Sequence, residues 1–332
     1  MERLSDIPVI SYWNNQSDFM YNYNSAYLPL IDQSATFALI VRVQNLLPDA
    51  TSIYDVGPSQ LVVVTNINGS NTDYTYVDKL NIIIDSEDKP YQIAGAEDPR
   101  VYLFNNIYYL FYTAVDWTEN HFWHAQVALA TCDAQTNPMK KENWQLHPPL
   151  FPELHWSKSG TLLIHNDTHR FLFFNESNIE VAVTQDLIHY EYTGKTFLQI
   201  RPNYFDSELV EPGPEPRKIS DGNYLFLYNS GRQVSTPNSK PNWHREYNVG
   251  WAIMDKNDPM NILARSDEPI LSPVLDWEKC DNNSDKWSDL GLTPLVVFVE
   301  GWKQIAHDEF IVWYQGCDSV TGVAKLTIKF DT

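Results

Sequence analysis

Two adjacent carboxylates carry the clearest acid–base chemistry in the sequence. Residues 94–100 read Ala-Gly-Ala-Glu-Asp-Pro-Arg and place Glu97 beside Asp98. Aromatic and β-branched residues follow on both sides of a short polar turn, a pattern that predicts a β-hairpin. Pro99 disfavours helical geometry at Asp98. We therefore expect the acidic pair at the start of a strand, where a sheet can aim it at a ligand. A simple ion pair with Arg100 is the alternative.

Composition favours a neutral ligand over a polyanion. The 332 residues carry a formal charge of -20, and 14% of them are aromatic. Such a surface repels nucleic acid and anionic membranes, so neither is expected as a partner. Aromatic faces and carboxylates together are typical of carbohydrate sites. The composition therefore suggests a small oligosaccharide ligand, and nothing in it fixes an oligomeric state.

The cysteines and the N-terminal residues give further expectations. Cys132, Cys280 and Cys317 are far apart, which predicts neither a metal site nor a disulfide framework. No basic-then-apolar leader opens the sequence and no apolar run approaches a membrane span. We expect a cytoplasmic protein without metal or cofactor, or a secreted or periplasmic one if a leader has been removed.

Five similar units recur along the chain. Each has a polar motif, an apolar strand, a turn, an aromatic-rich strand and often a third, alternating strand. The strand-forming segments of the five units fall within residues 22–65, 98–131, 156–183, 211–254 and 295–326. Five β-meanders predict an all-β fold, a five-bladed β-propeller that forms a single catalytic domain over residues 1–332. An all-β sandwich is the alternative.

A propeller would bring remote polar residues together. The innermost strands of a propeller converge on its axis, so the motifs that precede them gather at one end. We expect one funnel to contain Asn24, Asp98, Lys158, Glu211 and Asp318. A sandwich would scatter the same residues.

The ordered motifs resemble glycoside hydrolase family 130, the β-mannoside phosphorylases and β-mannosidases. The resemblance covers nearly the whole chain, and the family fold is a five-bladed propeller. The motifs that carry it are Tyr-Asn-Ser-Ala at 23–26, Glu-Asp-Pro-Arg at 97–100, Trp-Ser-Lys-Ser-Gly at 156–160, Val-Glu-Pro-Gly-Pro at 210–214, Tyr-Asn-Val-Gly-Trp-Ala at 247–252, Asp-Pro at 258–259, Arg-Ser at 265–266, Pro-Ile-Leu at 269–271, Phe-Val-Glu-Gly at 298–301 and Tyr-Gln-Gly-Cys-Asp at 314–318.

The resemblance implies roles for several residues. The aspartate of the Glu-Asp-Pro-Arg motif is the family's general acid, which assigns that role to Asp98. In the family's phosphorylases, basic residues hold a phosphate that attacks from the opposite face. Glu211 appears here in place of one such lysine, and Asn229 in place of a histidine. A carboxylate binds phosphate poorly but can activate water, as an inverting hydrolase requires. The resemblance thus implies an inverting exo-β-mannosidase, similar to the family's β-1,2-mannosidases, with Glu211 as the base and Glu246 acting with it or in its place.

Two other functions remain open. A β-mannoside phosphorylase or mannosyltransferase/phosphorylase of the same fold would use inorganic phosphate, and Lys158, Arg232, His244 and Arg245 could supply an anion site. A non-catalytic carbohydrate-binding propeller would bind sugar without turnover.

The substrate-binding residues are expected among polar and aromatic side chains at blade ends. A basic residue beside Asp98 would keep it ionised, which opposes an acid role. Trp156 and Trp243 are further candidates for sugar platforms, with blade packing as the alternative. The expected binding residues are Asn24, Ser25, Arg42, Glu97, Arg100, Asp116, Trp117, Lys158, Asn229, Tyr247, Glu278 and Asp318.

Overall fold

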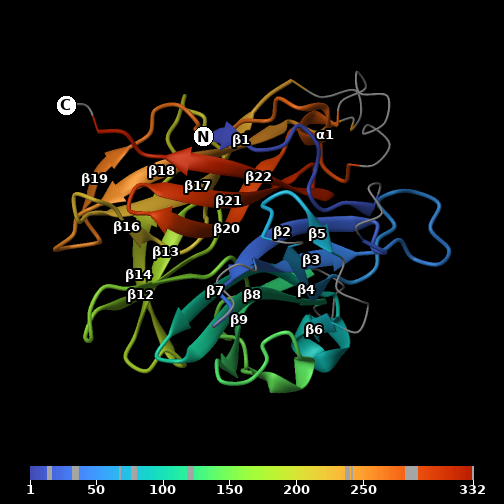
Figure 1. Ribbon diagram of the computed structural model, residues 1–332, viewed down its shortest axis with the longest axis horizontal. Helices are drawn as coiled ribbons and strands as arrows, with labels where there is room; N and C mark the ends of the chain where they lie inside the picture. Colours follow the sequence, from blue (N-terminus) through green and yellow to red (C-terminus); the bar gives the residue numbers. More distant parts are fainter. Residues whose placement is uncertain are drawn as a thin grey trace.

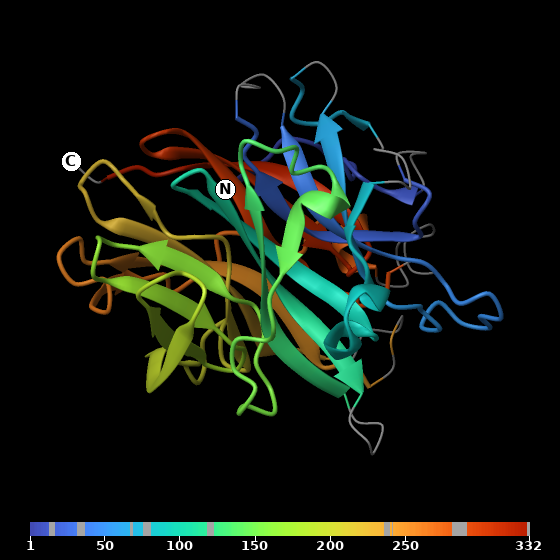
Figure 2. The same ribbon diagram turned by 90° about the horizontal axis from the view of Figure 1, so that it is seen from below.

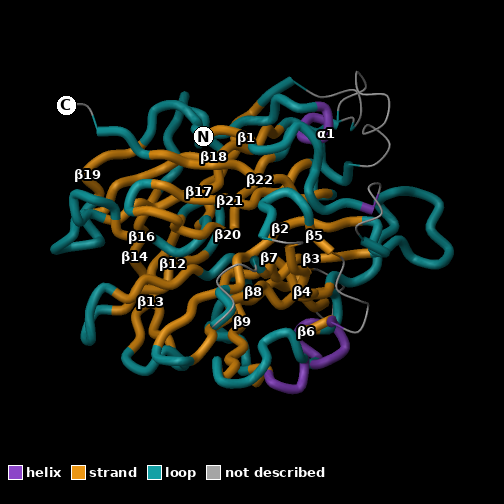
Figure 3. The backbone as a smooth tube through the Cα atoms, viewed as in Figure 1, coloured by secondary structure: helices purple, strands orange, loops and turns teal. Residues whose placement is uncertain are grey.

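Strands account for most of the molecule, and helices are confined to short segments between them (Figure 3). The computed structural model describes residues 1–12, 17–31, 37–66, 69–75, 81–117, 123–235, 240, 242–280 and 291–330. The short helices are η3 (Ser86–Asp88), η4 (Pro90–Gln92), η5 (Lys141–Asn143) and α1 (Asp276–Lys279). No helix within these ranges is long and apolar enough to cross a membrane.

The strands form five antiparallel sheets that follow one another around a ring (Figures 1 and 2). The first sheet contains β2 (Tyr21–Leu28), β3 (Ala38–Gln44), β4 (Gln60–Asn66), β5 (Tyr74–Thr75) and β6 (Ile82–Ile84). The second contains β7 (Gly95–Phe104), β8 (Ile107–Trp117), β9 (Trp123–Asp133) and β10 (Trp144–Leu146). The third contains β11 (Thr161–Ile164), β12 (Arg170–Phe174), β13 (Ile179–Thr184) and β14 (Tyr190–Leu198).

The remaining two sheets complete the ring. The fourth contains β15 (Leu209–Pro212), β16 (Arg217–Lys218), β17 (Tyr224–Gln233), β18 (Arg245–Met254) and β19 (Ile262–Arg265). The fifth contains β20 (Val297–Ala306), β21 (Glu309–Gly316), β22 (Val320–Thr327) and β1 (Glu2–Arg3). The architecture is the predicted five-bladed β-propeller.

Each pair of neighbouring blades shares its own hydrophobic core. Between the third and fourth blades, for example, Phe173 packs against Phe226 with ring centroids 5.5 Å apart. Trp313 of the fifth blade packs with Val41 of the first, so the core also continues across the point of closure. Both faces of each sheet are thus covered by its neighbours, and this explains why the middle strands, such as β3 and β8, are largely apolar on both sides.

The N-terminal strand closes the ring, a feature absent from the sequence prediction. Strand β1 pairs with β22 and so becomes the outer strand of the last blade (Figure 1). Arg3 fixes this contact because its Nε lies 2.7 Å from Oε1 of Glu278, which is fully buried. The first and last strands of the chain therefore belong to one sheet.

Three innermost strands contain a bulge at the axis. The pairing register shifts around Asn24 in β2, around Asp98 in β7 and around Glu300 in β20. Asn24 and Asp98 have φ values of 51°, which asparagine and aspartate tolerate better than most residues. A bulge re-aims the side chain of its extra residue. Three strands from three blades therefore direct a polar group to the same point.

Two sequence predictions need correction. The last unit was expected to begin its strands at residue 295, but its inner strand β20 begins at Val297 and continues to Ala306. No disulfide was expected, yet Cys280 and Cys317 are bonded to each other, 37 residues apart. The C-terminal end of α1 lies against the end of β21, and this tertiary contact has no signature in cysteine spacing. Cys132 is buried and free.

Candidate active site

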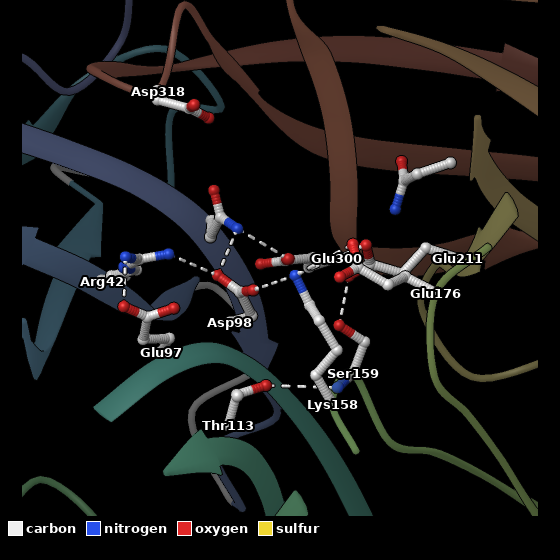
Figure 4. Close-up of polar contacts among 12 residues, drawn as sticks. Arg42, Glu97, Asp98, Thr113, Lys158, Ser159, Glu176, Glu211, Glu300 and Asp318 are labelled. Atoms are coloured by element: carbon white, nitrogen blue, oxygen red, sulfur yellow. Dashed lines mark hydrogen bonds and ion pairs between the residues drawn. The ribbon is translucent and has the colours of Figure 1, made fainter. Parts of the chain in front are cut away.

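A cavity of about 450 Å³ lies at the end of the axis where the bulges occur. All five residues expected in one funnel line it, although they come from different blades: Asn24, Asp98, Lys158, Glu211 and Asp318. Figure 4 shows Asp98, Lys158 and Glu211 close together and Asp318 farther away. The wall also contains Arg42, Glu97 and Tyr247 from the set of expected binding residues.

Asp98 is buried in a dense set of polar contacts. Its Oδ1 accepts hydrogen bonds from Asn24 Nδ2 at 2.5 Å and from Arg42 Nη1 at 2.8 Å. The other oxygen, Oδ2, lies 3.6 Å from Lys158 Nζ and is the one directed toward the glutamates (Figure 4). Arg42 also donates to Glu97 at 2.5 Å. The adjacent carboxylates therefore share one guanidinium, and the position of Asp98 is fixed by three blades.

Arg100 is buried behind the wall of the cavity and contacts residues that line it. Its guanidinium donates to the backbone oxygen of Asp98 at 2.9 Å and to that of Pro212 at 2.7 Å, which ties β7 to β15. The same group lies 3.5 Å from Glu300 and 3.7 Å from Glu211. Arg100 is only 2% exposed and does not line the cavity. It is therefore placed to position the acidic residues, and not to bind substrate as expected.

Lys158 lies between Asp98 and a pair of glutamates. Its Nζ is 3.6 Å from Glu211 Oε2 and 3.8 Å from Glu176 Oε2 (Figure 4). Burial alone would lower the pKa of Lys158, but Glu211, Glu176 and Asp98 together raise it well above its ordinary value. Lys158 is therefore a permanent cation surrounded by three carboxylates.

Glu211 is held at the base of the cavity. It lies on β15 within Val-Glu-Pro, where the following proline restricts the backbone. Ser159, which adopts a φ of 60°, donates its hydroxyl to Glu211 Oε1. Burial raises the pKa of Glu211 to about 7, although Lys158 and Arg100 act in the opposite direction. This carboxyl can therefore change protonation state near neutral pH.

The pKa values of the other acids of the site are shifted in different directions. Burial raises the pKa of Asp98, but Arg42, Lys158 and Arg100 outweigh it, so the pKa lies below the ordinary value. Burial raises the pKa of Glu300 well above its ordinary value despite the nearby Arg100. Glu300 accepts a hydrogen bond from Asn24 Nδ2 at 2.8 Å, so one amide joins Glu300 to Asp98. The resting site thus pairs an ionised Asp98 with acids that retain protons more readily.

Aromatic side chains border the mouth of the cavity. Trp123 and Trp156 line it and are 51% and 39% exposed. Trp117 does not line the cavity itself, but its ring stacks on Trp123 with centroids 3.7 Å apart. Tyr54 and Tyr247 line the same cavity from the first and fourth blades. Exposed indole rings that extend from a polar cavity suit the apolar faces of a sugar chain.

Several expected site residues lie outside the cavity wall. Ser25 is buried against Thr321, and Asp116 contacts His124 Nδ1 at 2.8 Å. Asn229 exchanges two hydrogen bonds with the backbone of Val299, so it joins the fourth and fifth blades. Ser25 and Asn229 thus join neighbouring blades, Asp116 joins two strands of one blade, and none of the three lines the cavity.

Glu246 and Glu278, the two remaining glutamates among the expected site residues, contact protein groups outside the cavity. Glu246 pairs with Arg232 at 2.7 Å on β18 and does not line the cavity, so it is not placed to act as a base there. Glu278 is fully buried, accepts from Arg3 and Tyr314, and caps α1 through the backbone of Leu275. Its role is structural, and the expectation that it binds substrate is wrong.

Sequence reasoning assigned no role to three polar residues of the site. Glu300 and Ser159 lie within motifs that were recognised, and their roles depend on contacts across blades. Glu176 follows β12 in an irregular Asn-Glu-Ser-Asn segment that carries no periodic signal. Only the fold reveals that Glu176 contacts Lys158.

Comparisons with known proteins agree with this geometry. A model of glycoside hydrolase family 130, described as beta-1,4-mannooligosaccharide phosphorylase, matches residues 65–330. A 1,2-beta-oligomannan phosphorylase from Thermoanaerobacter sp. is 29% identical over 99% of this chain and 98% of its own length. A beta-1,2-mannobiose phosphorylase from the same organism is 29% identical over 73% of this chain and 70% of its own length.

Solved structures share the fold. The beta-1,2-mannobiose phosphorylase of Listeria innocua, solved with beta-1,2-mannobiose, has a TM-score of 0.76 and 20% identity, and the match covers 98% of this chain and 96% of that one. A second structure has a TM-score of 0.72 and 22% identity, with 100% and 94% coverage. It was reported with the finding that this family of mannoside phosphorylases contains glycoside hydrolases that target beta-1,2 mannosidic linkages in Candida mannan.

Proposed function

The chain belongs to glycoside hydrolase family 130, and from this premise we propose that it is an inverting β-mannosidase acting on β-linked manno-oligosaccharides. The nucleophile in this proposal is water. The terminal mannose occupies the cavity, and the rest of the substrate extends past the exposed tryptophans.

The proposed reaction uses carboxylates on two sides of the sugar. Asp98 delivers a proton to the glycosidic oxygen, directly or through a sugar hydroxyl, as the bond from C1 to that oxygen breaks. A carboxylate beyond Lys158 removes a proton from water, whose oxygen forms the new bond to C1 from the opposite face. Both products are neutral sugars, and the mannose is released as the α-anomer.

The charge of the cavity is the observation that carries the choice of water. Five carboxylates and three cations occur among the described cavity-lining residues: Glu97, Asp98, Glu176, Glu211 and Asp318 against Arg42, Lys158 and Lys240. Arg42 and Lys158 are already surrounded by these acids. A phosphate dianion would meet net negative charge at close range, whereas water would not.

Phosphorolysis is the second candidate, and the curated relatives favour it. All three relatives are named phosphorylases. Such a reaction would require Lys158 to exchange its carboxylate partners for phosphate. Of the four residues of the alternative anion site, Lys158 lines the cavity, whereas Arg232, His244 and Arg245 do not.

The dependence of turnover on phosphate separates the two functions. Purified protein is incubated with β-1,2-mannobiose and with other β-linked mannobioses, with and without inorganic phosphate, and products are separated by anion-exchange chromatography. Hydrolysis predicts free mannose at equal rates in both conditions. Mannose 1-phosphate as the main product, with no turnover in the absence of phosphate, would establish the second candidate instead.

A further inference from the structure

Two glutamates that line the cavity contact Lys158 on the side away from Asp98, and they differ in exposure. The Glu176 side chain is 27% exposed, whereas that of Glu211 is 2% exposed. A general base must reach a water molecule that stands against the sugar. Glu176 and Glu211 lie at similar distances from Lys158, so their exposure is what distinguishes them as candidate bases.

The hydrogen-bond partners of the two glutamates make the same distinction. Ser159 donates to Glu211 Oε1, which also faces Arg100, and Glu211 Oε2 faces Lys158. Ser159 and Arg100 are themselves buried, whereas the partner of Glu176 Oε1 is the exposed ring of Trp156. Glu176 Oε1 accepts the indole N–H of Trp156 at 3.2 Å, and its Oε2 faces Lys158 from within the cavity wall.

We propose that Glu176 is the catalytic base that takes the proton from the attacking water, and that Glu211 is a positioning residue that holds Lys158. This inference rests on the proposed hydrolysis. The step is balanced: water loses one proton to Glu176 and adds its oxygen to C1, while the proton from Asp98 leaves with the released sugar. Exchange with solvent then restores both carboxyl groups.

The separation of the two carboxylates is compatible with this role. Oδ2 of Asp98 and Oε2 of Glu176 lie 3.6 and 3.8 Å from the same Lys158 Nζ. They are therefore at most about 7.4 Å apart, which allows only the lower end of the roughly 6.5–9.5 Å at which inverting enzymes place a sugar and a water between two acids. Trp156 orients Glu176, and Trp156 itself borders the cavity mouth. Trp156 is thus placed both to contact the sugar and to orient the base Glu176.

Chemical rescue tests the assignment. Glu176→Gln is expected to lower kcat for hydrolysis by about 10²–10⁴-fold with little change in KM. Glu176→Ala should regain turnover in sodium azide and form α-mannosyl azide, because the small anion replaces the activated water. Glu211→Ala should form no azide product, and Glu191→Gln, an exposed change in the same blade, should behave as wild type. Thermal unfolding and mannobiose calorimetry confirm that each variant is folded and binds sugar.

The outcomes separate failure of the base from failure of the function. Wild-type hydrolysis without phosphate, together with a Glu176→Gln variant within a few-fold of wild type, would overturn the role of Glu176 alone. Azide product from Glu211→Ala but not from Glu176→Ala would transfer the role to Glu211. Strict phosphate dependence of the wild type would remove both the hydrolysis and any base.

Discussion

The chemistry of this site depends on how one carboxylate can be an acid while three cations surround it. Arg42, Lys158 and Arg100 keep the pKa of Asp98 below its ordinary value after burial is taken into account. Substrate that enters between Asp98 and Lys158 would separate this pair and allow Asp98 to hold a proton. A hydroxyl of the bound sugar could carry that proton to the glycosidic oxygen.

Replacement of Asp98 tests its acid role. Asp98→Asn keeps the hydrogen bond from Arg42 but cannot donate a carboxyl proton, so turnover of mannobiose should fall by about 10²–10⁴-fold. The melting temperature should stay close to that of wild type. Asp133→Asn, at the far end of the same blade, is the matched control. Activity retained in Asp98→Asn would remove the acid assignment.

Glu211 should make stability depend on pH. Folding raises its pKa from 4.5 to about 7. The stability that the protonated carboxyl contributes is therefore complete below pH 4.5 and is lost as the pH rises through about 7. The loss amounts to about 3 kcal/mol at most. Between about pH 5 and pH 8, the melting temperature of Glu211→Gln should fall less than that of wild type; parallel curves would contradict the assignment.

The sequence predicted the axial residues better than it predicted their partners. Asn24, Asp98, Lys158, Glu211 and Asp318 could be placed at one end of the ring because each stands at the end of a recognisable strand unit. Their partners depend on contacts between blades that no local pattern encodes. For that reason Glu176 was missed, and Glu278, whose partner Arg3 is 275 residues away, was misassigned.

At the scale of elements, the bulges explain how flat sheets can build a convergent site. Regular strands would point alternate side chains away from the axis. The bulges at Asn24, Asp98 and Glu300 interrupt that alternation. Gly301, immediately after the last bulge, allows the close approach of β20 to β2, because a Cβ there would collide with the backbone oxygen of Ser25.

The β8–β9 hairpin presents the aromatic wall and should set chain-length preference. Trp123→Ala removes a platform at the cavity mouth, so KM for mannotriose and longer substrates should rise about three- to tenfold, with a smaller change for mannobiose. Tyr204→Ala removes an exposed ring that lies outside this cavity and serves as the control. Equal effects on short and long substrates would argue against an extended platform.

Strands that are buried on both faces were predicted from the sequence, whereas the outermost strands of the blades were not. Within the predicted unit 156–183, the apolar runs 161–164 and 170–174 form β11 and β12 on either side of an unambiguous turn. The outermost strands β5, β10, β14 and β19 were not predicted. Strands β5, β10 and β19 are short. Strand β14 is longer but polar, and most of its residues are exposed or half-buried. Such strands form because a neighbouring strand offers hydrogen bonds, and this information is absent from local sequence.

At the scale of the whole molecule, five repeated units predicted the ring, but its closure required the structure. Four of the inter-blade cores are local, since consecutive blades build them. The core between the fifth and first blades joins residues from opposite ends of the chain. Two residues of β1 add the final strand, and a two-residue strand is too short for periodicity to reveal.

The closing strand should contribute more to stability than its length suggests. Arg3→Met would leave the buried Glu278 carboxylate without its cation and should lower the free energy of unfolding by about 3 kcal/mol. Lys325→Met removes the partly exposed pair with Glu309 on the same sheet and should cost less than about 1 kcal/mol. Chemical denaturation of both variants measures the difference. Equal losses would mean that the β1 contact does not hold the ring closed.

In the proposed reaction, water attacks the mannosyl carbon from the face opposite Asp98. Time-resolved proton NMR follows turnover of the methyl glycoside of β-1,2-mannobiose in phosphate buffer before mutarotation, because its blocked reducing end leaves a single free mannose among the products. Attack by water from that face gives free α-mannose as the first signal, with the same rate when phosphate is replaced by another buffer. First appearance of β-mannose, or of α-mannose 1-phosphate, would contradict it.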